Sequence, residues 1–155
     1  MKYFNIAGPC NSADHYMIDA STRLKGVEQL INQKQYFVIH AARQSGKTTY
    51  IRDLTQRLNA EGQYYALYCS LESVQNVVEP KDGIPAILDC IVLALQDYDI
   101  PFVYKDSYDQ DKKNKPLSLL SIFLRDLSKG LDKPLVILFD EADCLSENTL
   151  ISFLR

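Results

Sequence analysis

Residues 41–48 constrain this chain more than any other part of its sequence. They read Ala-Ala-Arg-Gln-Ser-Gly-Lys-Thr, follow an apolar run at 36–39, and precede a segment with helical periodicity. A Gly-Lys-Thr ending between a strand and a helix is typical of a phosphate-binding loop, whose backbone N–H groups surround a polyphosphate. We therefore expect a nucleotide site formed by Ala41, Ala42, Arg43, Gln44, Ser45, Gly46, Lys47, Thr48 and Thr49.

The residue types in this loop suit phosphate chemistry. Gly46 lets the backbone approach phosphate closely, and Lys47 has the length to reach the outer phosphates. The hydroxyl of Thr48 is a ligand for Mg²⁺. The strict pattern begins with glycine, whereas this chain has Ala41. The departure is mild, because that position asks only for a small residue at the turn from strand to loop.

A second apolar run, at 135–139, ends in the acidic residues Asp140 and Glu141. Five apolar residues bounded by Pro134 and by carboxylates predict a fully buried, central parallel strand, and ligands collect at the carboxyl ends of such strands. We expect Asp140 to hold the Mg²⁺ shell, usually through water, and Glu141 to orient or deprotonate the water that attacks the γ-phosphate. Taken alone, the acids are also typical of a solvated turn, and the loop at 41–48 favours the metal site.

With these two motifs the chain resembles the P-loop ATPases of the additional-strand group, which includes AAA and STAND ATPases. The glutamate directly after the Walker B aspartate, here Glu141, carries this resemblance together with the Walker A residues at 46–48. The segments 4–9, 15–16 and 36–40 resemble bacterial AAA-like ATP-binding proteins. The resemblance implies a three-layer α/β/α fold with a mostly parallel sheet, and ATP with Mg²⁺ as the bound cofactors.

The same resemblance implies a domain organisation. Residues 1–155 would be the N-terminal part of one AAA-like ATPase domain, with a lead-in segment at 1–34 and a nucleotide-binding core at 35–155. In such families the region before the first strand contacts adenine, which here makes 16–24 a candidate. The strand that bears a polar sensor residue follows the acidic strand in sequence, so it would lie beyond Arg155. We therefore expect a fragment, truncated before that strand and before any trans-acting arginine finger.

Apolar periodicity and breaker residues predict the remaining elements. Strands are expected at about 36–40, 64–69 and 135–140, and helices at about 47–60, 84–97 and 116–129, with a further helix starting near 148. A shorter helix is expected at 21–32. Gly62 is expected to end the helix that follows the loop, while Pro85 and Pro116 suit the first turns of the next two helices. The polar stretch 105–115 has both charge signs and predicts an exposed loop.

Composition favours a soluble, folded, cytoplasmic protein with no membrane partner. Hydrophobic residues make up 46% of the chain and charged residues 24%, and the apolar runs are too short to span a bilayer. No signal peptide follows Met1. The cysteines at 10, 69, 90 and 144 lack paired spacing, which predicts buried thiols rather than a zinc site or disulfides. The net charge of −3 argues against broad electrostatic attachment to nucleic acid.

Five other polar residues near the motifs have two interpretations each. His40 would satisfy a local hydrogen bond or touch nucleotide, and Arg43 and Gln44 would be solvent-facing spacers or contacts to substrate or a neighbouring subunit. Glu72 follows the strand at 64–69, so it would be an acid beside the metal ligands if the strands are parallel, or a strand-end carboxylate without a catalytic role. Asp143 is expected to cap the next turn rather than bind metal.

Two classes of function are compatible with these motifs. The first is an Mg-dependent ATPase that works on a protein or nucleic-acid partner, with Lys47 and Glu141 catalytic and Thr48 and Asp140 holding the metal. The second is a nucleotide-gated switch like the STAND signalling proteins, in which ATP or ADP selects a conformation and hydrolysis is slow or incidental. The intact motif residues argue against a third class, a degraded interaction domain. Self-association is compatible with either of the first two.

Overall fold

A computed structural model of the chain describes residues 2–4, 13–16, 26–40, 42 and 45–154. The chain separates into two compact units, Met1–Gln56 and Arg57–Arg155, and the boundary lies inside helix α2 (Lys47–Glu61). The protein is mixed α/β, with several helices and a small parallel sheet of two strands. Within the described ranges, no helix combines the length and hydropathy that a membrane crossing requires.

Among the described residues of the first unit, one short helix precedes α2. Helix α1 (Val27–Asn32) begins after Gly26, whose φ of 100° lies in the left-handed region. The helix buries Val27 and Ile31, which lie four residues apart and so share one face. The expected helix at 21–32 is thus confirmed from residue 27 onward, and residues 21–25 lie outside the described part of the chain.

The strand predicted at 36–40 is wrong. The segment forms no strand. It exposes Tyr36 and Val38, which are 105% and 73% accessible, while Phe37 and Ile39 are half-buried. A strand exists only where its N–H and C=O groups pair with a neighbour, and none of the residues that the structure describes forms a ladder with this segment. Apolar content therefore does not make this segment part of the sheet.

Helix α2 matches its predicted bounds closely. Ile51, Leu54 and Leu58 form one buried stripe, with exposures of 4%, 0% and 4%. Gly62 ends the helix with a φ of 73°, and its N–H donates to the carbonyl of Asn59 at 3.1 Å. The side chain of Asn59 then bonds both backbone groups of Ala66, its Nδ2 donating at 2.7 Å and its Oδ1 accepting at 2.9 Å. This side chain therefore pairs with the strand that follows.

The sheet lies in the second unit and consists of β1 (Tyr65–Ser70) and β2 (Leu135–Asp140). The strands are parallel, and Ser70 is level with Asp140, so both strands end at the same edge of the sheet. The predictions for 64–69 and 135–140 are confirmed. The prediction that β2 is fully buried is wrong, because only Leu138 and Asp140 are buried. In the described part of the chain β2 has a strand on one side only, which leaves its other residues half-buried.

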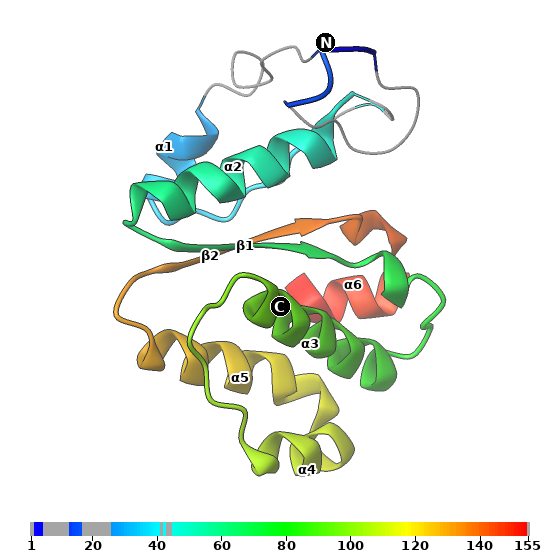
Figure 1. Ribbon diagram of the computed structural model, residues 1–155. Helices are drawn as coiled ribbons and strands as arrows, with labels where there is room; N and C mark the ends of the chain where they lie inside the picture. The colour runs from blue at the N-terminus through cyan, green and yellow to red at the C-terminus, as the bar shows by residue number, and fades with distance from the viewer. Residues whose placement is uncertain (1, 5–12, 17–25, 41, 43–44, 155) are drawn as a thin grey trace. The chain divides into compact units, whose positions relative to one another are not determined.

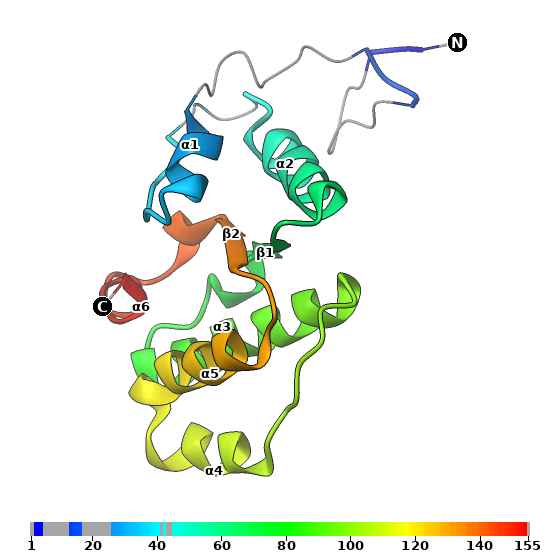
Figure 2. The ribbon, with the colours of Figure 1, turned by 90° about the vertical axis from the view of Figure 1, so that its left-hand side faces the viewer.

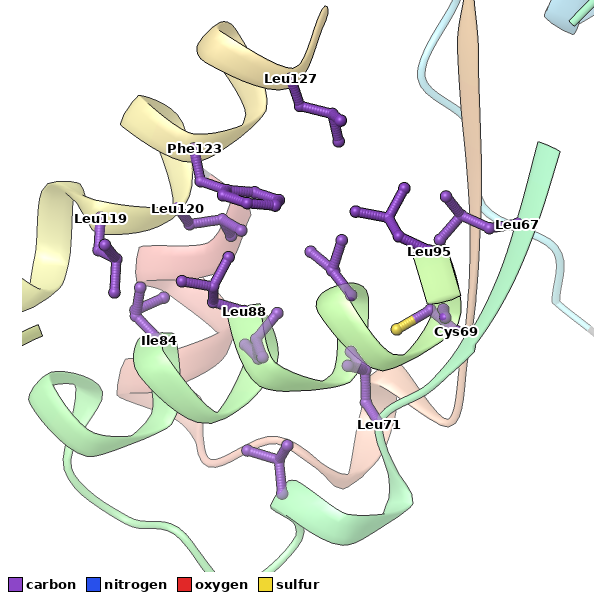
Figure 3. Close-up of a cluster of buried hydrophobic side chains, with 14 of the residues drawn as sticks. Leu67, Cys69, Leu71, Ile84, Leu88, Leu95, Leu119, Leu120, Phe123 and Leu127 are labelled. Carbon is purple, nitrogen blue, oxygen red and sulfur yellow. The ribbon is translucent and has the colours of Figure 1, made fainter. Parts of the chain in front are cut away.

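One face of the sheet packs against helices of the same unit. Helices α3 (Pro80–Asp97) and α5 (Pro116–Gly130) lie side by side below the strands, and α6 (Glu147–Leu154) contacts α3 (Figures 1 and 2). Leu67 and Cys69 of β1 point from the sheet into the cluster formed by these helices (Figure 3). Side chains alternate along a strand, so Tyr68 and Ser70 belong to the opposite face. The acidic strand end is thus supported from behind by an apolar core.

Helix α3 begins four residues before its predicted start at 84. Pro80 occupies the first turn, and Pro85 lies inside the helix, so the predicted role of Pro85 is wrong. Pro80 suits the first turn, because the N–H groups of that turn have no partner within the helix. Pro85 lies further in, so its missing N–H leaves out one helical hydrogen bond to the carbonyl one turn earlier. Pro116 does begin α5. Gly83 lies where α3 packs against α6, because a Cβ there would lie 2.5 Å from Cγ2 of Thr149.

The loop predicted at 105–115 is also wrong, because Asp106–Asn114 forms helix α4. Acidic residues occupy its first turn and lysines its last, an order that complements the helix dipole. Tyr108 is 2% exposed, and its ring lies 5.3 Å from that of Phe123 on α5. Lys112 pairs with Asp89 of α3 at 2.7 Å. The buried ring of Tyr108 and this ion pair together hold α4, whose composition is almost entirely polar, against the neighbouring helices.

The three described cysteines are free thiols. Cys69 is buried, and this burial, with a smaller contribution from Cys90, raises the pKa of Cys69 to about 12. Cys90 and Cys144 are half-buried, so the expectation of buried thiols is confirmed fully only for Cys69. Cys10 lies outside the described residues. A thiol that resists ionisation packs as a small apolar side chain.

Candidate functional site

The predicted phosphate loop is described in part. Ala42 and residues 45–49 are included, whereas Ala41, Arg43 and Gln44 lie outside the described residues, as does the candidate adenine segment from 17 onward. The N–H of Ser45 donates to the carbonyl of Ala42 at 3.3 Å, which closes a turn just before α2. Lys47, Thr48 and Thr49 are half-buried in the first turn of that helix.

Gly46 makes the transition from this turn to α2. Its φ is 85°, in the left-handed region that glycine adopts without steric cost. Its carbonyl accepts the N–H of Tyr50 at 2.9 Å, so the helical hydrogen bonds start at this residue. A helix directs its first N–H groups and the positive end of its dipole toward whatever precedes it. Lys47 and Thr48 therefore stand where an anion is favoured.

The acidic residues lie at the carboxyl end of the sheet in the second unit. Asp140 is the last residue of β2 and is 2% exposed. Its Oδ1 accepts the backbone N–H of Glu141 at 3.0 Å, and its Oδ2 accepts the hydroxyl of Tyr68 at 3.2 Å. Hydrogen bonds to both oxygens hold the plane of a carboxylate in one orientation. Asp140 is therefore an oriented carboxylate at a strand end.

Glu141 follows in an uncommon backbone conformation. Its φ of 58° and ψ of 31° are left-handed, which costs a residue with a side chain about 1–2 kcal/mol. Its carbonyl accepts the N–H of Cys144 at 3.0 Å and closes the short turn Ala142–Cys144. The Glu141 side chain is exposed. Such conformations concentrate at functional sites, and here one occurs at the predicted catalytic residue.

Besides Asp140 and Glu141, the carboxylates of Asp143 and Glu72 border this end of the sheet. Burial is the main cause that raises the pKa of the Cys144 thiol, and the charges of Asp143, Glu141 and Glu72 add to it. Glu72 follows β1 directly, so its predicted position beside the acidic strand end is confirmed. A locally negative surface of this kind favours a divalent cation.

Asp143 does not cap the next turn, contrary to prediction. It lies within the turn Ala142–Cys144, and the helix after that turn is capped by Ser146 instead. The Oγ of Ser146 accepts the N–H of Thr149 at 3.4 Å and donates to the carbonyl of Val78 at 2.8 Å. A serine three residues before that N–H has the reach for an N-cap, whereas Asp143 is too early in the sequence.

Tyr68 is the contact that sequence reasoning missed. It lies on β1, two residues before the strand ends, and shares the face of Ser70 and Asp140. The available signal was the alternation of side chains along two parallel strands. That signal requires the register, which pairs Tyr68 with Leu138. The backbone of Leu71 adds a second link, because its N–H donates to the carbonyl of Asp140 at 3.0 Å.

The loop and the acids belong to different units of the chain. In the described ranges, no group of three or more His, Cys, Asp or Glu side chains is arranged to hold a metal. The predicted Mg²⁺ ligands are one hydroxyl and one carboxylate, so they do not form such a cluster. His40 is exposed.

The second unit also has a cavity of about 400 Å³, lined partly by Phe102, Tyr108 and Phe123. Its two charged residues bind each other, with Nζ of Lys105 2.6 Å from Oδ2 of Asp126. Both charges are thus already paired within the protein. The cavity is separate from the residues that the motifs single out.

Comparison of the chain with protein-family models, with curated proteins and with solved structures returned no significant match.

Proposed function

We propose that this protein binds ATP with Mg²⁺ and hydrolyses it, as a P-loop ATPase of the additional-strand group. One observation carries the proposal: Gly46 is left-handed, with a φ of 85°, directly before a helix that starts with Lys47 and Thr48. That backbone conformation favours glycine at position 46. In a phosphate-binding loop the following lysine contacts the phosphates, and the hydroxyl after it is a ligand for Mg²⁺. The sequence motif and the local backbone thus agree.

The loop binds the phosphates in this proposal. The N–H groups at the start of α2 favour a bound anion, and Lys47 neutralises the charge that develops on the γ-phosphate. Thr48 and Asp140 are the residues that would hold Mg²⁺, which supplies further charge neutralisation when bound. The oriented carboxylate of Asp140 and the negative surface around it fit such an ion.

Glu141 serves the attacking water. An exposed carboxylate next to the metal-holding aspartate can orient water and accept its proton. The left-handed backbone of Glu141 turns the chain immediately after the strand, so adjacent carboxylates need not point in the same direction. The two acids therefore have separate roles.

The proposal extends to the fold. The parallel strands β1 and β2, with α3 and α5 on one face, would form part of a three-layer α/β/α sheet of the P-loop type. The nucleotide state would act on a protein or nucleic-acid partner. A slow, nucleotide-gated switch is the alternative outcome that the following experiment separates.

The test compares ATP binding and turnover in four variants of the chain. Lys47→Ala should weaken Mg-ATP binding by at least about 100-fold, because it removes a charge-assisted contact to phosphate. Glu141→Gln should keep binding and lose at least about 100-fold in turnover. Lys129→Ala and Glu147→Gln are the controls, since each makes the same chemical change at an exposed position in another helix. Binding is measured by calorimetry and turnover by phosphate release.

Each outcome has a distinct meaning. Loss of turnover in Glu141→Gln with binding retained supports the hydrolytic function. If the parent binds ATP tightly but hydrolyses it negligibly, the nucleotide-gated switch is the better assignment than the hydrolytic function. Binding by Lys47→Ala that equals the parent, or no binding by the parent, rejects the nucleotide site.

A further inference from the structure

The hydroxyl of Tyr68 lies against the carboxylate that the proposed function assigns to the metal. It donates to Oδ2 of Asp140 across 3.2 Å, from the neighbouring strand. The other oxygen, Oδ1, accepts the N–H of Glu141 at 3.0 Å. Each oxygen of the Asp140 carboxylate therefore accepts a hydrogen bond, one from a side chain of β1 and one from the backbone directly after β2.

The strand register explains why Tyr68 reaches this carboxylate. Tyr68 is level with Leu138, and Asp140 lies two residues further along the same face of β2. A tyrosine side chain is long enough to cover that diagonal. Leu67 and Cys69 lie on the other face and pack in the core beside it. The backbone of β1 is thus held firmly under the tyrosine.

We propose that Tyr68 is a positioning residue, which orients the Asp140 carboxylate for Mg²⁺ and sets the affinity of the site for that ion. The proposal rests on the proposed function of Asp140. Tyr68 acts through Asp140 and is not itself a metal ligand or a catalytic residue. Its hydroxyl restrains Oδ2 of Asp140, while the backbone N–H of Glu141 restrains Oδ1.

The size of the effect follows from the contact. Groups that orient a metal ligand typically contribute 10–100-fold in metal affinity. A separation of 3.2 Å is at the long end for an O–H···O hydrogen bond. The lower part of the range therefore applies, and removal of the hydroxyl should weaken Mg²⁺ binding about tenfold.

The experiment measures the Mg²⁺ dependence of ATP binding in Tyr68→Phe. Calorimetry gives the affinity for ATP in the presence of EDTA and across a Mg²⁺ titration, so metal affinity is separated from nucleotide affinity. Tyr65→Phe is the matched control. It removes a hydroxyl from the same strand, where Tyr65 donates to Asp132 at 2.9 Å at the opposite end of the sheet. Thermal unfolding of both variants checks the fold.

In Tyr68→Phe the half-saturating Mg²⁺ concentration should rise about tenfold, with Mg-free ATP affinity unchanged. Tyr65→Phe should match the parent in both. Equal Mg²⁺ dependence in Tyr68→Phe and the parent overturns the proposal. So does an equal loss of affinity with and without Mg²⁺, because a merely structural role would affect both.

A second measurement uses the unmodified protein and needs no variant to fold. With ¹³C-labelled tyrosine, addition of Mg²⁺ to the ATP-bound protein should shift the ring signal of Tyr68 and leave that of Tyr65 unchanged. An unmoved Tyr68 signal at saturating Mg²⁺ contradicts the proposal. If ATP binding by the parent does not depend on Mg²⁺, Asp140 does not hold the metal, and the proposed function is wrong. If ATP binding by the parent does depend on Mg²⁺ and Tyr68→Phe behaves like the parent, only the proposal for Tyr68 is wrong.

Discussion

The segment 36–40 and strand β2 are both apolar runs that lead into a polar motif, yet their backbones differ. Tyr36 and Val38 are 105% and 73% exposed, and the segment has no ladder with any described residue. Strand β2 pairs with β1 along its whole length, and its last residue, Asp140, is 2% exposed. The comparison shows that a partner, rather than apolar composition, makes a strand.

The same comparison shows how each motif is held. The phosphate loop is anchored on its C-terminal side, where Gly46 leads directly into α2. The acidic residues are anchored on their N-terminal side, by the ladder of β2 and by Tyr68. Substitutions in the segment 36–40 and substitutions behind strand β2 should therefore differ in their effects on the stability of the protein.

The largest effect is expected in the core behind the sheet. Leu67→Ala removes a side chain that is 0% exposed and should lower the free energy of unfolding by about 2–5 kcal/mol. Val38→Ala, at a side chain that is 73% exposed, should change it by less than about 0.5 kcal/mol. Urea unfolding measures both variants. A cost for Val38→Ala comparable to that of Leu67→Ala would remove the distinction between the two regions.

An intermediate effect is expected where α3 meets α6. Gly83→Ala places a Cβ 2.5 Å from Cγ2 of Thr149, which is 0% exposed, so it should cost about 1–3 kcal/mol through overpacking. The control is Gly130→Ala at the end of α5, where an added Cβ meets nothing within 4 Å. That variant should be neutral or slightly stabilising, because alanine is the better helix former. Equal stability of the two variants would show that α6 is not packed on α3 as described.

The smallest effect concerns the ion pair between Lys105, directly before α4, and Asp126 of α5. The hydrogen bond from Lys105, and then that from Tyr108, lowers the pKa of Asp126 below its ordinary value. A lowered native pKa means that the contribution of Asp126 to stability is present above the unfolded value and is lost as the pH falls through the native pKa. Asp126→Asn should therefore flatten the acid limb of a stability curve measured from pH 7 to pH 2.

Asp97→Asn, at the end of α3, is the charge-matched control for that curve. The effect of Asp126 is small because Lys105 is 51% exposed, and exposed ion pairs contribute little. High salt should reduce it further. An acid limb of unchanged steepness in Asp126→Asn would show that the pair does not contribute to stability.

Local patterns predicted several elements well. The helix at 47–60 was expected from its apolar stripe and from Gly62, and the structure has α2 at Lys47–Glu61. The strand at 135–140 was expected from its apolar run and its acidic end, and β2 has those bounds. Both signals depend on residues close together in sequence, which is why they could be read directly.

The failures involve partners distant in sequence. Helix α4 was predicted as a loop because its composition is polar, and its single buried anchor, Tyr108, gains meaning only from Phe123 on α5. The strand at 36–40 was predicted from its own residues, without a partner to complete it. Pro85 suits a first turn only if α3 begins near 84, and the earlier start of the helix at Pro80 places Pro85 in its interior.

The sequence by itself determined which residues carry the proposed chemistry: the loop ending in Gly46, Lys47 and Thr48, and the acids Asp140 and Glu141. It could do so because phosphate and metal chemistry require particular side chains at fixed, short spacings. Only the tertiary structure decided that Tyr68 holds Asp140, since the two residues lie 72 positions apart and meet through strand register. Register depends on the packing of the whole sheet against its helices, which no short segment encodes.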